Sequence, residues 1–216
     1  MVGLEDIIGF CAVVVAAAVS PAQLLALLRA DKHHSRTDPA HPAHTVSLVS
    51  SVLVCVCNTL WCVYGVLHGA VWSAVLGVLA ITVQITVLVV CVTARVIQWW
   101  FLSCLGVLLG AVAYAGYLMP AGMLGFIAAS MAVVNYLPAA VKQYRAVLSG
   151  TLSTRTAYSL SMGLIMLSAN LLWIAYAVAI RDIWVGLPCV INAATSVVFI
   201  VTHSVVVRHS RKAVAV

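Results

Sequence analysis

Seven long apolar runs, separated by short polar connections, constrain this chain more than any other feature. The runs cover residues 7–28, 45–67, 71–92, 101–119, 124–148, 157–179 and 183–206. Each is close to the roughly 20 residues that an α-helix needs to cross the hydrocarbon core of a bilayer. Strands of a transmembrane barrel would be shorter and would alternate apolar with polar residues. The sequence therefore predicts an all-α integral membrane protein with seven transmembrane helices.

The composition excludes a soluble globule. Of the 216 residues, 64% are apolar and only 7% are charged, and the mean hydropathy is +1.15. A soluble domain is about half apolar and a quarter charged. The formal net charge of +6 could suggest nucleic acid as a partner, but the basic residues lie in short clusters between apolar runs. That distribution is typical of a topology signal, so we expect the lipid bilayer, and no nucleic acid, as a partner.

The basic residues also predict an orientation. Ten of the 11 lysines and arginines lie in the first and third connections, in the region from the end of the fifth run to the sixth, and in the C-terminal tail, and only Arg181 lies on the opposite side. By the positive-inside rule, the N-terminus is then outside and the C-terminus cytoplasmic. An odd number of spans likewise places the two termini on opposite sides of the membrane. We expect the plasma membrane as the location, with the first run as a permanent span because no basic segment precedes it.

Cysteines and histidines do not predict a metal site or a cofactor. The seven cysteines all lie within apolar runs, and no pair has a metal-ligand spacing. Four histidines lie in the connection 29–44, where flanking prolines favour a solvated loop. The interior of the spans contains no carboxylate, so the acid–base pair that most enzymes need is missing. We therefore expect no enzyme, no cofactor and no metal.

An internal repeat is the strongest pattern within the runs. Residues 58–64 read NTLWCVY, and residues 170–176, which lie 112 positions later, read NLLWIAY. The same offset places Trp72 on Trp184. Spans one to three thus resemble spans five to seven, and span four is the linker that lets both triplets insert with one orientation. Parallel repeats of this kind typically hold a substrate near the membrane midplane, at the repeat interface.

Several motifs together resemble the SWEET and PQ-loop transporters. They are a Ser-Pro-x-Gln element in span one (Ser20 to Gln23), a Trp-x-x-Tyr-Gly element in span two (Trp61 to Gly65), and the run from Asn170 to Pro188. The resemblance covers nearly the whole chain. It implies two parallel three-helix bundles joined by a linker helix, with a first repeat at 6–93, the linker at 97–120, a second repeat at 122–207 and a cytoplasmic tail at 208–216.

The resemblance also implies which residues bind substrate. The family has an asparagine sixteen residues after each tryptophan of the repeat, and here those positions hold Gly77 and Cys189, with Asn192 one turn further on. Asn58 lies three residues before Trp61, and Asn170 lies three residues before Trp173. In each pair the tryptophan could stack on a sugar ring while the amide binds its hydroxyls. The predicted substrate-binding residues are Asn58, Trp61, Gly77, Asn170, Trp173, Cys189 and Asn192. The predicted hinges are Pro21, Pro42, Pro138 and Pro188.

The function predicted from the sequence is passive transport of a small polar solute, most simply a sugar, by alternating access of the two bundles. The spans have no ionisable residue at midplane depth, which argues against proton coupling. Two alternatives stay open. One is a proton-coupled PQ-loop amino-acid transporter, and the other is a receptor or scaffold with the same fold that transports nothing. The sequence does not decide whether the chain forms a homo-oligomer.

Overall fold

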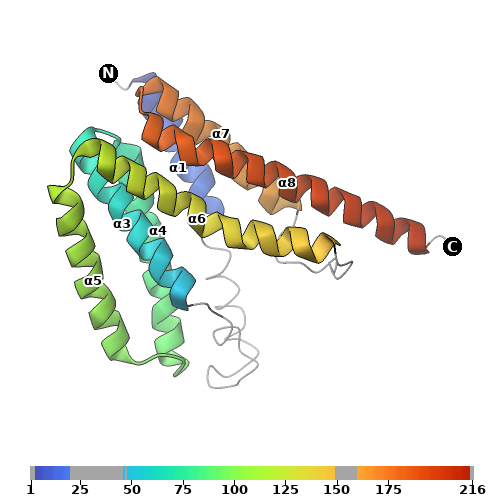
Figure 1. The fold of residues 1–216 in the computed structure, drawn as a ribbon, viewed down its shortest axis with the longest axis horizontal. Coiled ribbons are helices and arrows are strands. Elements are labelled where there is room, and N and C mark those ends of the chain that lie inside the picture. The colour runs from blue at the N-terminus through green and yellow to red at the C-terminus, as the bar shows by residue number, and fades with distance from the viewer. Residues whose placement is uncertain (1–2, 20–45, 47, 149–159, 215–216) are drawn as a thin grey trace. The chain divides into compact units, whose positions relative to one another are not determined.

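All regular structure in the described residues is helical (Figure 1). The structure is a computed structural model that describes residues 3–19, 46, 48–148 and 160–214, with side chains at 3–18, 46, 48–135, 163–198 and 200–201. The helices, in chain order, are α1 (Leu4–Val19), α3 (Leu48–His68), α4 (Val71–Thr93), α5 (Trp99–Leu118), α6 (Ala121–Leu148), α7 (Leu160–Ala179) and α8 (Ile183–Val214). The predicted all-α membrane fold is confirmed.

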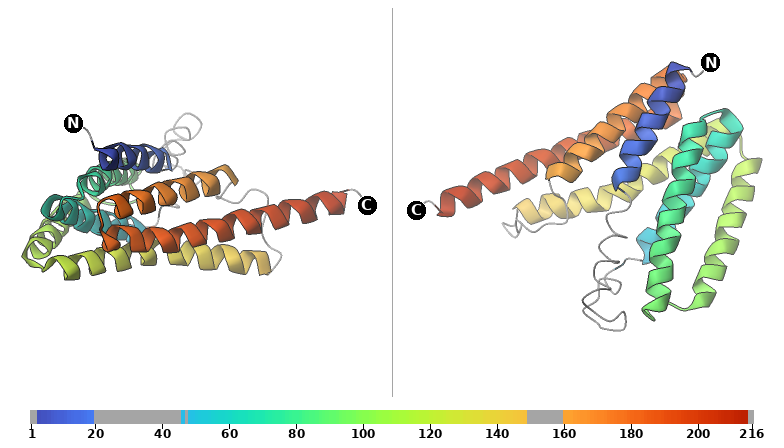
Figure 2. Two further views of the ribbon diagram at one scale, coloured as in Figure 1. Left: turned by 90° about the horizontal axis from the view of Figure 1, so that it is seen from above. Right: turned by 180° about the vertical axis from the view of Figure 1, so that it is seen from behind.

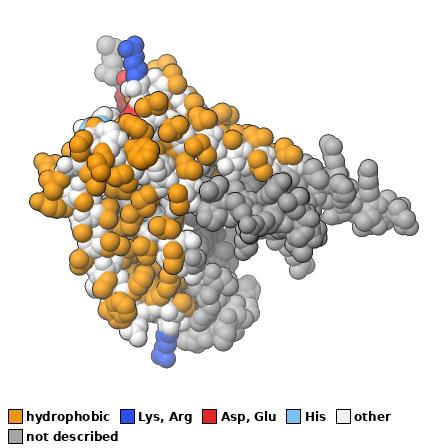
Figure 3. All heavy atoms as spheres, in the orientation of Figure 1, with side chains coloured by type: hydrophobic (Ala, Val, Ile, Leu, Met, Phe, Trp, Pro, Cys, Tyr) orange, Lys and Arg blue, Asp and Glu red, His pale blue; other side chains and the backbone are white. Residues whose placement is uncertain are grey.

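Three of the described helices, α3, α4 and α5, are long and apolar enough to cross a membrane. Shorter apolar helical stretches cover Ala121–Asn135, Gly163–Ala179 and Ile183–Val198. On the face drawn in Figure 3, apolar side chains are spread over the described helices, and the few charged side chains in view lie at two opposite ends. Because a water-exposed surface of this kind would be unstable, the distribution is that of helices embedded in lipid.

Helix boundaries follow the apolar runs closely. From the second run onwards, each helix begins and ends within three residues of the predicted limits, with one exception. Helix α8 continues to Val214, beyond the end of the last apolar run at residue 206. Its final turns contain arginine, lysine and alanine, which are good helix formers, so the helix does not need to stop where the apolar run stops. The second half of the first run, after Val19, lies outside the described residues.

The turns between helices have local causes. Gly69 follows α3 with a φ of 77°, a left-handed conformation that glycine adopts without strain and that commonly ends a helix. Arg181, at the equivalent place after α7, has a φ of 56°. Met119 after α5 is extended, with φ −82° and ψ 147°, because it precedes Pro120. Asp182 caps α8, since its Oδ1 accepts hydrogen bonds from the backbone N–H groups of Trp184 (2.9 Å) and Val185 (3.3 Å).

The chain divides into two compact units. One contains residues 1–15 and 132–216, and in it α7 packs against α8 (Figure 2). The other contains residues 16–131, and in it α3 packs against both α4 and α5. The three-helix grouping predicted from the repeat stays a prediction, because part of the first predicted span lies outside the described residues.

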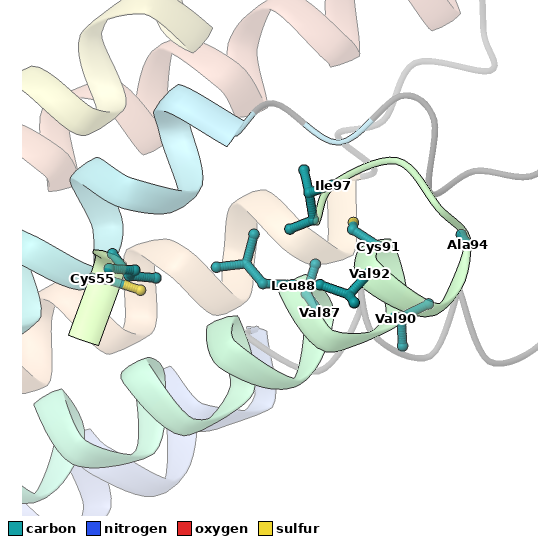
Figure 4. Packing of buried hydrophobic residues seen from close by; sticks show 9 residues of the cluster. Cys55, Val87, Leu88, Val90, Cys91, Val92, Ala94 and Ile97 are labelled. Carbon is teal, nitrogen blue, oxygen red and sulfur yellow. The ribbon is translucent and has the colours of Figure 1, made fainter. Parts of the chain in front are cut away.

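The main apolar cluster of the second unit lies at the end of α4. Leu88 and Cys91 are fully buried there, next to Cys55 from α3 and Leu105 from α5. Figure 4 shows that the side chains of the last turns of α4 and Ile97 of the following loop form one packed group. Burying apolar groups inside protein gains little over lipid, so tight packing, and not hydrophobicity, must hold these helices together.

Candidate functional site

Two predicted site residues, Asn58 in α3 and Asn170 in α7, make the same hydrogen bond. Asn58 Nδ2 donates to the backbone oxygen of Val54 at 2.8 Å, and Asn170 Nδ2 donates to that of Met166 at 2.7 Å. Both acceptors lie four residues earlier in the same helix, and both asparagines are partly buried. The two amides therefore make the same bond within their own helices, which uses one of the two N–H groups of each Nδ2.

The tryptophans of the repeat also share one geometry. Trp61 packs edge-on against Tyr64, with ring centroids 5.7 Å apart and an angle of 85° between the ring planes. Trp173 packs against Tyr176 in the same way, at 5.5 Å and 81°. Edge-to-face contact is a favourable arrangement of two aromatic rings, and it fixes the indole plane. Trp173 is more deeply buried, at 6% exposure, whereas Trp61 is half-buried.

Small residues bring the helices of each pair into close contact. In the α3–α4 pair, a Cβ placed on Gly65 would lie 3.0 Å from the Cβ of Ala74. In the α7–α8 pair, a Cβ on Gly186 would lie 3.2 Å from the Cβ of Ala177. These contacts are equivalent under the offset of 112. At the far end of the first pair, Gln84 Nε2 donates to Ser51 Oγ at 2.7 Å.

The positions where the family has its second asparagine differ between the two repeats. Gly77 faces α3: a Cβ there would lie 2.6 Å from Cys62 Sγ and 2.8 Å from the backbone oxygen of Asn58. Gly77 and Asn58 are thus brought together at the α3–α4 contact, where a larger side chain has no room. Cys189 in α8 is partly buried, and its thiol donates to the backbone oxygen of Val185 at 3.2 Å.

Asn192 is the most distinctive polar residue of α8. It is only 7% exposed, and its Oδ1 is buried with no hydrogen-bond partner among the described residues. One turn further on, the fully buried Ser196 donates from Oγ to the backbone oxygen of Asn192 at 2.8 Å. A buried oxygen without a partner is costly and calls for an explanation. Cys189, Asn192 and Ser196 lie three to four residues apart, so they share one side of α8.

The predicted hinge prolines are described only in part. Pro188 lies inside α8 and is buried, one turn before Asn192. Pro138 falls within α6, at a position whose side chain is not described, and Pro21 and Pro42 lie outside the described residues.

Among the residues with described side chains, no three His, Cys, Asp or Glu side chains come together as a candidate metal site.

Comparison with known proteins gives one line of evidence. No protein-family model matches the sequence, and no curated protein matches it. Among solved structures, that of a eukaryotic SWEET transporter, determined at 3.7 Å resolution, matches with a TM-score of 0.76. The match covers 95% of this chain and 100% of the other. This chain has the SWEET fold. The sequence identity is 11%, so the similarity establishes the fold of the two proteins and leaves the function to be argued from the site.

The structure also brings out residues for which the sequence analysis proposed no role. Tyr64 and Tyr176 orient the two tryptophans, Ser196 adds a second buried polar group to α8, and Ser51 pairs with Gln84 between α3 and α4. One signal could have found most of them. Tyr64 and Tyr176 are 112 residues apart, as are Gln84 and Ser196, so polar or aromatic residues recur at equivalent positions of the two repeats.

Proposed function

We propose that this chain is a membrane transporter that carries a small sugar passively, as a uniporter, by alternating access of its two three-helix repeats. The observation that carries the proposal is the repeated Asn–Trp–Tyr element. In α3 and in α7 the asparagine and the tryptophan have matching geometry. The SWEET fold, which extends over nearly the whole chain, supports the same function.

The chemistry of the element suits a sugar. A pocket for a small polar solute is mostly apolar and has a few well-placed hydrogen-bonding groups. A tryptophan offers a flat apolar surface to the C–H face of a sugar ring, and an amide can bind hydroxyl groups. Asn170 and Trp173 lie three residues apart in α7, so they share one side of the helix. Asn58 and Trp61 have the same spacing in α3.

The charges of the described residues support passive transport. Coupling to a proton gradient requires a group that gains and loses charge within the membrane. The acidic residues with described side chains are Glu5 and Asp6 in the first turn of α1 and Asp182 at the start of α8. All three lie at helix ends.

We propose that the protein works in the plasma membrane, with its N-terminus outside and its C-terminus in the cytoplasm.

The experiment that tests the proposal is uptake into liposomes containing the purified protein. A panel of radiolabelled monosaccharides and disaccharides is compared with a panel of neutral amino acids, and empty liposomes give the background. We expect protein-dependent uptake of at least one sugar and none of the amino acids. Uptake of amino acids alone would contradict the sugar assignment, and no uptake of either class would contradict the transporter assignment.

A further inference from the structure

The connection between α4 and α5 holds one basic side chain in a fixed position. Arg95 has a φ of 58°, a left-handed conformation that is uncommon outside glycine. Its backbone N–H donates to the oxygen of Val92 at 2.9 Å. Ala94 and Ile97, on either side of it, are buried in the apolar cluster of Figure 4. The turn is thus fixed by its backbone bonds and its buried residues, while the Arg95 side chain is exposed.

No carboxylate neutralises Arg95 within the described part of its unit. The described residues of that unit, 16–19, 46 and 48–131, include no aspartate or glutamate, and Arg95 is their only lysine or arginine. A guanidinium carries a full positive charge and five N–H donors. The partner that this charge favours is therefore an anion from outside the unit.

The start of α5 also has no capping side chain. Gln98 precedes the helix with extended backbone, φ −98° and ψ 156°, but its side chain makes no cap hydrogen bond. Its Oε1 accepts instead from the indole Nε1 of Trp100 at 2.6 Å. In the other unit, the carboxylate of Asp182 caps α8 directly after the second left-handed arginine, Arg181. The chain supplies its own anion after Arg181, and among the described residues it supplies none after Arg95.

The surroundings of the α4–α5 connection are those of a lipid headgroup. Because α4 and α5 are both long and apolar enough to cross a membrane, the connection between them lies at the membrane surface. Only 11% of the apolar window of α5 is buried inside the protein. Trp100, Val107 and Tyr114 recur every seven residues along α5 and are all exposed, so they form one apolar stripe that begins near the connection.

We infer that the α4–α5 connection binds the phosphate of an anionic phospholipid, with Arg95 as its charged contact. The amide nitrogen of Gln98 adds a donor, the indole of Trp100 lies at headgroup level, and the acyl chains follow the exposed stripe of α5. With the proposed orientation, the lipid belongs to the cytoplasmic leaflet, where anionic lipids attract basic residues. This lipid site is separate from the Asn–Trp–Tyr element and does not depend on which solute is transported.

Native mass spectrometry of the protein in a neutral detergent measures the lipid that is bound. Dioleoyl phosphatidylglycerol is compared with dioleoyl phosphatidylcholine, which has the same chains and a phosphate but no net charge. Wild-type protein should bind the phosphatidylglycerol more tightly. Arg95→Gln should weaken that binding roughly fivefold, the change expected for one basic residue at an anionic lipid surface, and should leave the binding of phosphatidylcholine unchanged.

Two glycine variants separate lipid binding from folding. Glycine adopts the left-handed conformation without strain, so Arg95→Gly should melt no lower than wild type in lipid-free detergent and should still lose the preference for phosphatidylglycerol. Arg181→Gly is the matched control, because Arg181 has a φ of 56° and is exposed but is followed by the Asp182 cap. This variant should keep the preference.

Four results would overturn the lipid site. They are equal binding of the two lipids by the wild-type protein, a preference that survives in Arg95→Gln, an equal loss of preference in Arg181→Gly, and displacement of phosphatidylglycerol by inorganic phosphate alone. The third would mean that the overall positive charge attracts the lipid, and the fourth that the connection binds a soluble anion. We expect inorganic phosphate to displace none of the lipid, because it brings no acyl chain to the stripe of α5.

Discussion

Gly65 and Ala74 meet across the α3–α4 contact, and the second repeat has the same contact with the two residue types exchanged. At the equivalent positions, Ala177 on α7 meets Gly186 on α8. One partner of each contact is a glycine and the other an alanine, so each helix pair has room for a single methyl group. Close approach through small residues is a common way in which membrane helices associate, because it increases packing and brings backbones together.

Gly65→Ala should destabilise the protein more than Gly186→Ala. A Cβ on Gly65 would lie 2.6 Å from the backbone oxygen of Ala70 and 2.7 Å from the backbone nitrogen of Ala74, and neither atom can move without shifting the turn. Overpacking of this kind costs about 1–3 kcal/mol. On Gly186 the nearest atom would be 3.2 Å away. Melting temperatures in detergent should fall clearly for the first variant and little for the second. Equal melting temperatures would contradict the contact.

Trp173→Ala should lose most sugar transport. Removing a stacking surface from a bound solute costs on the order of 1–3 kcal/mol, or roughly 5- to 150-fold in rate. Because Trp173 is buried, its truncation also threatens folding, so Trp173→Phe serves as a second variant that keeps an aromatic ring. It should retain part of the transport. Trp99→Ala is the control, since Trp99 begins α5 and is 63% exposed. Unchanged uptake by folded Trp173→Ala would assign Trp173 to packing alone.

Restoring the family's asparagine should succeed in one repeat and fail in the other. Cys189→Asn should fold and keep or raise sugar transport, because the Cys189 side chain is partly buried and bonded only to its own helix. Gly77→Asn should give little folded protein, since Cys62 Sγ and the Asn58 backbone oxygen occupy the space of its Cβ. Yields of monodisperse protein and uptake rates measure both effects. Good folding of Gly77→Asn would show that this contact can open.

The orientation can be tested by labelling two exposed positions at opposite helix ends. His68 ends α3 and Gln98 precedes α5, and both are exposed. In intact cells, His68→Cys should react with a membrane-impermeant thiol reagent above the background of the parent chain, and Gln98→Cys should react only after the membrane is permeabilised. The reverse pattern would overturn the orientation that the basic residues predict.

The sequence was sufficient to predict the helices, because uninterrupted apolar runs of this length have one stable solution in a bilayer. It also predicted the repeat, and the matching geometries of Asn58 with Asn170 and of Trp61 with Trp173 show that the repeat extends to side chains. The faces of the helices were not predictable, since helices that are apolar all round carry no hydrophobic stripe.

The candidate site was harder to predict for the same reason. The family pattern places Gly77 beside the substrate. Whether a side chain at this position would have room depends on how closely α3 and α4 approach each other. The lack of a partner for Asn192 Oδ1 depends on what surrounds α8. Both are properties of packing, which a single sequence specifies only through many weak contacts.

The most direct test of the central claim is the final distribution of a transported sugar across the membrane. Liposomes containing the protein are given a pH gradient and a radiolabelled sugar, and the internal concentration is followed until it is constant. A passive facilitator should bring the internal concentration to the external value and no higher, whether or not a protonophore is present. Accumulation above the external concentration that collapses when the protonophore is added would contradict the account.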